Sequence, residues 1–153
     1  MLCLARGPLR AAEPASTHSF NGPETAWQVV DDERIGRVLA HECAAGGARD
    51  TTGFERIVIA APGGQSVQLI CPTVPVAVLE ELEVRIWVKA NRPDIQLAAQ
   101  VALPRSATEN GKSGASAIVR GAKYDRPGHW QQLVLKNVPK QLRRTARRGS
   151  RDR

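Results

Sequence analysis

The chain of 153 residues is poor in aromatic side chains, which make up only 4% of it. Its core must therefore be built from aliphatic side chains, and 42% of its residues are hydrophobic. That share is too high for a disordered chain, and the length suits one domain with one core. No apolar run approaches the roughly 20 residues that a membrane-spanning helix needs. The sequence therefore predicts a folded domain without a membrane span.

The chain also lacks the short motifs of common enzyme classes. It contains no GxSxG, P-loop, GxGxxG or HExxH sequence. Its three histidines, His18, His41 and His129, are scattered. His41 and Glu42 are neighbours on a predicted strand, so their side chains point to opposite faces and cannot act as a pair. We therefore predict no catalytic residues and no enzyme activity in this chain itself.

Cysteines are few, and the three present are Cys3, Cys43 and Cys71. They form no CxxC pair and no Cys/His cluster at zinc spacing. Cys43 and Cys71 could form one disulfide in an oxidising compartment. The alternative is two small buried thiols.

Asp31, Asp32 and Glu33 form an acidic run at 31–33. It is typical of a solvated turn, although hard oxygen ligands also suit a structural calcium ion, which Asp125 could join. The ligand set is incomplete, so we predict neither a metal site nor a cofactor.

The net charge of +7 would suggest nucleic-acid binding if the basic residues were spread over the whole domain, but they are not. Residues 140–153 carry seven basic side chains and one acidic side chain, whereas residues 1–139 carry 15 basic and 14 acidic ones. The basic character therefore belongs to a tail, and such tails are usually solvated. A nearly neutral body argues against a specific nucleic-acid partner.

Residues 1–24 are rich in Pro, Ala and Ser and show no periodicity, which predicts a leader and linker. The short apolar start and the segment LRAA at 9–12 resemble the end of a secretory signal peptide. We therefore expect a clipped signal and an extracellular or periplasmic, secreted protein.

Residues 25–138 form the predicted domain, and residues 139–153 a basic helix and tail. The domain consists of short runs of alternating apolar residues, separated by Gly, Pro and Asn. This pattern is typical of an all-β protein, and we predict an antiparallel β-sandwich of jelly-roll type. Asn137 is a candidate N-cap for the helix, with Pro139 in its first turn. The predicted strands are 26–30, 36–46, 54–61, 65–72, 82–91, 95–104, 115–121 and 129–138.

The run LEVRIWVKAN at 82–91 alternates without interruption. Its apolar residues share one face of a strand, so Trp87 is the one large apolar side chain on the polar face. If 82–91 pairs with 95–104 so that Ala90 meets Ile95, every core partner is apolar, which specifies the register well. We therefore predict a hairpin over 82–104, followed by a long polar loop at 105–114.

Two segments resemble the carbohydrate-binding modules with a galactose-binding-like jelly roll. In these modules a mid-domain strand reads hydrophobic-x-hydrophobic-Trp-x-Lys-Ala, and a later strand opens Gly-x-Trp. The matching residues here are Trp87, Lys89, Ala90, Gly128 and Trp130. The chain also looks like the N-terminal β-sandwich of secreted bacterial proteins in which a glycosidase-like barrel follows. Because no closing strand follows the basic helix, we expect this chain to be a fragment of a longer protein.

The predicted hairpin surrounds Trp87 with polar side chains and places small Ala98 opposite the indole. A flat indole can stack on the apolar face of a sugar ring, while amide and cationic groups bind its hydroxyls. The alternative is that a loop such as 105–114, or a neighbouring domain, covers the indole. The predicted ligand-binding residues are Trp87, Arg85, Lys89, Gln96 and Gln100.

The segment YDRPGHW at 124–130 is the second candidate for ligand contact. It could form a polar and aromatic binding loop. Its other interpretation is a structural Pro-Gly turn before a strand, with Trp130 at the start of the core face. The secondary candidates are Tyr124, His129 and Trp130.

Two function classes remain open from the sequence. The first is a non-catalytic carbohydrate-binding or accessory module of a larger secreted protein. The second is a structural or interaction domain that packs against a neighbouring catalytic domain and binds no free ligand. The surroundings of Trp87 discriminate between them, because only the first needs an indole that a ligand can reach.

Overall fold

A computed structural model describes residues 20, 22–30, 36–47, 52–62, 66–107 and 113–149. Most of the predicted leader lies outside the described residues, and so do Cys3, His18 and the acidic run at 31–33. The chain forms two compact units that divide after Val76, and each is described by itself below.

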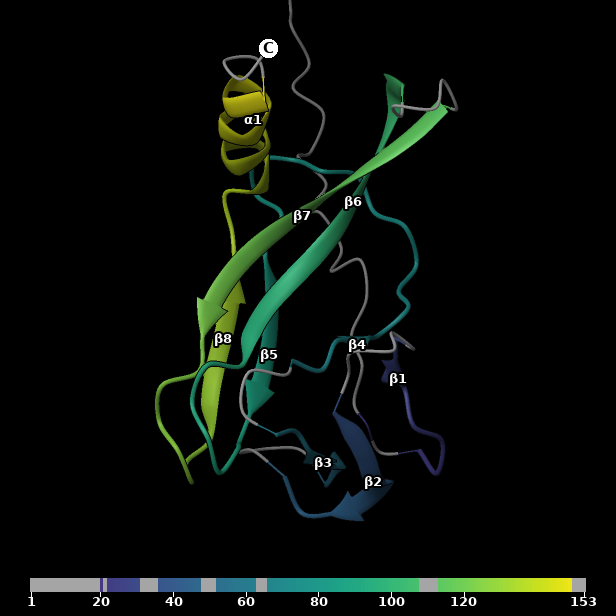
Figure 1. The fold of residues 1–153 in the computed structure, drawn as a ribbon, viewed down its shortest axis with the longest axis vertical. Helices are drawn as coiled ribbons and strands as arrows, with labels where there is room; N and C mark the ends of the chain where they lie inside the picture. The colour runs from purple at the N-terminus through teal and green to yellow at the C-terminus, as the bar shows by residue number, and fades with distance from the viewer. Residues whose placement is uncertain are drawn as a thin grey trace, which may run out of the picture. The chain divides into compact units, whose positions relative to one another are not determined.

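The first unit contains two short antiparallel sheets of two strands each, both drawn in Figure 1. The register of β2 (Arg37–Ala45) and β3 (Gly53–Ala60) shifts between Val38 and Ala40, where Leu39 is 59% exposed. Such a bulge inserts one extra residue into one strand of an antiparallel pair. Strand β1 (Gln28–Val29) pairs with β4 (Leu69–Ile70), and β2 (Arg37–Ala45) pairs with β3 (Gly53–Ala60).

The second unit pairs strands that are not all neighbours in the sequence (Figure 1). Strand β5 (Val84–Val88) pairs antiparallel with β8 (Gln131–Leu135). Between them in the sequence lies a long antiparallel hairpin of β6 (Gln96–Ala107) and β7 (Ser113–Lys123).

A single hydrophobic core joins the two sheets of the second unit. Strands β6 and β7 contribute their alternate apolar residues, and β8 contributes Leu133 and Leu135, of which Leu135 is 0% exposed. The half-buried residues Val84, Ile86 and Val88 of β5 pack against the same core. The two sheets are therefore two layers, and the intervening residues of each strand face away from the core. The buried residues are Leu97, Val101, Val119, Tyr124, Leu133, Leu135 and Val138.

Helix α1 (Val138–Gly149) follows β8 directly. The backbone N–H of Gln141 donates to the backbone carbonyl of Asn137 at 3.1 Å. Asn137, with φ at 58°, therefore occupies the predicted N-cap position. Val138 is buried in the core, and Leu142 packs against it. Arg143 forms an exposed ion pair with Glu80 at 2.9 Å.

The predicted fold class is confirmed, because the described part of the chain has eight strands, all in antiparallel pairs, and one short C-terminal helix. Each of the eight predicted strand segments overlaps one observed strand, although β3, β6 and β7 extend beyond the predicted bounds. Among the described residues, no helix combines the length and apolar character needed to cross a bilayer.

The predicted hairpin over 82–104 is wrong. Strand β5 pairs with β8 instead, with Ile86 opposite Leu133, and β6 pairs with β7, with Val101 opposite Ala117. The sequence pattern was misleading because alternation determines only which face of a strand is apolar. Any neighbouring strand with its own apolar face can pair with it equally well. The chain between β5 and β6 crosses from one layer to the other.

The predicted loop at 105–114 is also shorter than expected. Strand β6 continues to Ala107, and β7 begins at Ser113, which pairs with Ala107. A two-stranded ladder needs only backbone hydrogen bonds at its end, so polar residues can extend it beyond the core.

Gly121 allows β7 and β8 to approach closely. A Cβ at this position would lie 2.8 Å from the Leu135 Cβ and 2.9 Å from the Val134 carbonyl oxygen. We expect Gly121→Ala to lower the free energy of unfolding by about 2 kcal/mol, as overpacking of a core does. Chemical denaturation measures this loss. Gly22→Ala is the control, because among the described residues the only neighbour of its methyl group would be the Glu24 nitrogen, at 4.0 Å. An equal effect of both changes would contradict the prediction.

Candidate functional site

The face of the β5–β8 sheet that points away from the core carries the predicted aromatic residue. Trp87 is half-buried and lies directly opposite exposed Gln132, while exposed Arg85 lies opposite Val134. These four residues alternate with the core residues of their strands, which places them together on the outer face. Three of the five predicted ligand-binding residues therefore share one surface, since Lys89 follows in the same alternation.

Continuing the strand register beyond β5 and β8 places Lys89 opposite Trp130 and Glu83 opposite Lys136. Trp87 and Trp130 are then diagonal neighbours on the outer face, within reach of large aromatic side chains. Trp130 is half-buried and is not among the residues that pack against the core. Its predicted place at the start of the core face is taken by Leu133 and Leu135 of β8.

The Glu83 and Arg85 side chains of this outer face hold each other in ionised form. Arg85 Nη2 donates to Glu83 Oε2 at 2.8 Å. This hydrogen bond is the main cause that lowers the pKa of Glu83, and the charges of Arg85 and Lys136 lower it further. The same bond raises the pKa of Arg85. The face therefore presents fixed charges, with the Arg85 side chain 60% exposed.

The other two predicted residues, Gln96 and Gln100, do not join this surface. Both lie on β6 at positions that alternate with the core residues Leu97 and Val101, so they face away from the core on the other layer. Their amide groups bind within their own hairpin. Gln96 Nε2 donates to the Gly121 carbonyl at 3.3 Å, and Gln100 Nε2 donates to Ser116 Oγ at 3.1 Å.

Tyr124 supports the loops beside the outer face rather than the surface itself. Its side chain is 1% exposed, so it has no surface to offer a ligand. Its hydroxyl accepts the Ala90 N–H at 3.1 Å, and its proton lies within reach of the carbonyl oxygens of Ala90, Arg126 and His129. Tyr124 therefore connects the end of β5 to the loop between β7 and β8.

The remaining secondary candidate, His129, is exposed at the end of that loop. Its Nδ1 lies 3.1 Å from the Pro127 carbonyl oxygen. Gly128 has φ at 81°, and its backbone N–H donates a hydrogen bond to the Ala90 carbonyl at 2.7 Å. The loop therefore has the geometry of the structural turn that was one of its two interpretations.

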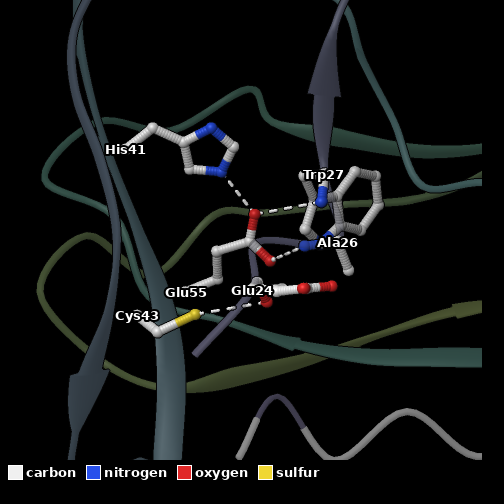
Figure 2. Close-up of polar contacts among 6 residues, drawn as sticks. All are labelled: Glu24, Ala26, Trp27, His41, Cys43 and Glu55. Carbon is white, nitrogen blue, oxygen red and sulfur yellow. Dashed lines mark hydrogen bonds and ion pairs between the residues drawn. The ribbon is translucent and has the colours of Figure 1, made fainter. Parts of the chain in front are cut away.

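A second polar cluster, centred on Glu55 of β3, lies in the first unit (Figure 2). The Glu55 carboxylate accepts hydrogen bonds from the backbone amides of Ala26 and Trp27, each at 3.0 Å, and contacts His41 Nε2. Its side chain is only 3% exposed. The cluster therefore ties the segment before β1 onto the β2–β3 sheet.

Sequence reasoning missed this cluster. Register pairs Glu55 with Cys43, and His41 lies two residues earlier on the same face of β2, so the contact is diagonal across the sheet. The only signal was an acidic residue that shares one face of a predicted strand with apolar Ile57 and Ile59. Because the register of β2 and β3 was unknown, the sequence could not show which side chain faces that acid.

The thiols near Glu55 are separate and bind backbone carbonyls. Cys43 Sγ donates to the Glu24 carbonyl at 3.5 Å, and Cys71 Sγ to that of Pro72 at 4.0 Å, so no disulfide joins them. Burial raises the pKa of the Cys71 thiol, and the charge of Glu55 raises it further. Cys71 therefore stays protonated and is a poor nucleophile.

The geometry of the Glu55 cluster is not that of a catalytic Cys–His pair. In the view of Figure 2, the His41 ring faces Glu55, and the Cys43 sulfur lies on the far side of the carboxylate. A shallow, open depression beside them is lined by Pro23, Glu24, Thr25, His41, Glu42 and Cys43. Within the described ranges, no three His, Cys, Asp or Glu side chains are placed to hold a metal ion.

Comparison of the chain with protein-family models, with curated proteins and with solved structures finds no match in any of the three. The resemblance to galactose-binding-like modules therefore rests on the sequence segments around Trp87 and Trp130. The candidate site rests on the geometry of the β5–β8 outer face.

Proposed function

We propose that this chain is a non-catalytic carbohydrate-binding or accessory β-sandwich module of a larger secreted protein. One observation carries the proposal, namely that Trp87 lies on the outer face of the β5–β8 sheet with Arg85 and Lys89 beside it. An indole on a flat strand pair offers an apolar platform, and adjacent polar side chains can orient a ligand by hydrogen bonds.

The outer face has the mixed character that sugar recognition requires. Gln132 is exposed directly opposite Trp87, and its amide can both donate to and accept from hydroxyl groups. Trp130 adds a second indole at the diagonal position, so the platform extends across both strands. A sugar ring could stack on one indole while a neighbouring ring reaches the other.

A second function is favoured by a different observation. The segment that follows β4 in the first unit exposes aliphatic side chains, with Val74 69% exposed and Val76 41% exposed. Exposed apolar residues that lie close together in the chain commonly mark surfaces that another protein covers. This supports the alternative of an interaction domain that packs against a neighbouring catalytic domain and has no free ligand.

Substitution of Trp87 by alanine separates the two functions. If Trp87 is a platform, glycan binding falls by about 2 kcal/mol or more, as for a central aromatic anchor, and the melting temperature changes little. If Trp87 is a covered contact, stability falls by about 3 kcal/mol or more. A glycan array followed by titration calorimetry measures binding, and thermal unfolding measures stability.

Ile118→Ala is the control for that experiment. Ile118 is 51% exposed and lies on the outer face of the β6–β7 sheet, in the layer opposite Trp87. Its removal should leave glycan binding unchanged. An array on which the wild-type chain binds no glycan would end the carbohydrate proposal and favour the interaction domain.

A further inference from the structure

We propose that the outer face of the β5–β8 sheet selects glycans that carry carboxylate groups, namely polysaccharides built from uronic acids. This inference rests on the proposed function and names the substrate class of the same site. It comes from the charges around Trp87, because a platform for neutral sugars needs polar groups but no excess of one charge.

The outer face has an excess of positive charge. Its charged side chains are Arg85, Lys89 and Lys136 against a single acid, Glu83. In the described part of the chain, Glu83 is paired with Arg85, whereas Lys89 forms no ion pair. Unlike residues 1–139 as a whole, whose charges nearly balance, this surface is complementary to an anion.

The positions of the cations fit a saccharide carboxylate in particular. Arg85 lies two residues before Trp87 on β5, and Lys89 lies two residues after it, just beyond the end of β5; along a strand this is about 7 Å to either side. In a hexuronic acid, the carboxylate is attached at the edge of the sugar ring and projects outward from it. When the ring stacks flat on the indole, its carboxylate can therefore point along the strand toward either cation.

Arg85 is already placed to bind a carboxylate, since its guanidinium donates to that of Glu83 at 2.8 Å. A guanidinium has five N–H donors in a planar fork that matches carboxylate geometry. One donated bond leaves further donors for a ligand. The ammonium of Lys89, on the other side of the indole, provides a second contact that a chain of several uronic acids would use at the next ring.

The test compares two probes that differ only in the group at C6, which is a charged carboxylate in one and a neutral alcohol in the other. A hexamer of galacturonic acid is titrated into the full chain, and so is the same hexamer with its carboxyl groups reduced to alcohols. We expect the acidic hexamer to bind about tenfold more tightly, as two exposed charge pairs allow. Raising the salt concentration should reduce this preference.

A matched pair of variants locates the preference. Arg85→Gln/Lys89→Gln removes two positive charges from the outer face, and we expect it to abolish the preference, so that the variant binds the two hexamers with equal affinity. Lys140→Gln/Arg144→Gln removes two exposed charges from α1 and should leave the preference intact. Trp87→Ala should weaken binding of both hexamers.

The outcomes distinguish this inference from the proposed function. Equal affinity of the wild-type chain for both hexamers would overturn the uronate inference and leave carbohydrate binding standing. A preference that survives in the outer-face variant, or that disappears in the α1 variant, would overturn it too, because general attraction by the basic helix would then be the cause. Binding of neither hexamer would count against the inference, and a blank glycan array would remove the proposed function as well.

Discussion

Tyr124→Ala is expected to lower the free energy of unfolding of the chain by about 4 kcal/mol, within the range for truncation of a buried aromatic side chain. Tyr124 is 1% exposed and belongs to the hydrophobic core of the second unit. Its removal would leave a cavity that the strands of two layers cannot easily close.

The hydroxyl of Tyr124 adds a separate contribution. It accepts the Ala90 N–H at 3.1 Å and lies within hydrogen-bond distance of three carbonyl oxygens. Tyr124→Phe keeps the ring and removes these bonds, which leaves the Ala90 N–H without this acceptor. We expect a loss of about 2 kcal/mol, because an unsatisfied buried donor bears its full desolvation cost.

Urea denaturation followed by circular dichroism measures both losses, provided that the slope of the transition is unchanged. Lys123→Ala, next to Tyr124 but with a 60% exposed side chain in a loose ion pair with Asp94, is the control and should change stability by less than about 0.5 kcal/mol. If Tyr124→Phe were as stable as the wild type, the hydroxyl would not hold the loops together. A loss for Tyr124→Ala no larger than that of the control would contradict its place in the core.

Glu55→Gln is expected to destabilise the chain by about 3 kcal/mol, because it leaves hydrogen-bonding groups around a buried side chain unsatisfied. The carboxylate is 3% exposed and accepts hydrogen bonds from the amides of Ala26 and Trp27, each at 3.0 Å. The glutamine side chain is nearly isosteric, but it replaces one acceptor oxygen with a donor NH₂ group. A donor would then face a backbone N–H, and His41 would lose its anionic partner.

Glu42→Gln is the matched control for this change. Glu42 precedes Cys43 on β2 and pairs with Arg56 at 2.8 Å, but its side chain is 53% exposed. Exposed ion pairs contribute little, so we expect a loss below about 1 kcal/mol. Thermal and urea unfolding of the two variants measure the difference. Equal losses would show that burial of Glu55 contributes nothing, and the account of the first unit would be wrong.

The secondary structure of this chain follows largely from local sequence. Alternation over 82–91 placed the apolar residues of β5 on one face and Trp87 on the other, and both placements agree with the structure. The Asn137-Val138-Pro139 segment likewise marked the start of α1. Such features depend on backbone geometry and on residues within one or two turns, so they are encoded close to where they appear.

The partners of each strand, in contrast, were decided only by tertiary structure. Alternation in β5 is compatible with β6 or with β8, and packing of two layers around one core selects β8. That choice moves Gln96 and Gln100 away from Trp87 and brings Gln132 and Trp130 beside it. The diagonal contact of His41 with Glu55 depends equally on register across two strands. The two faces of a strand are determined by its own residues. A site built across strands forms only when tertiary packing has determined which strands pair.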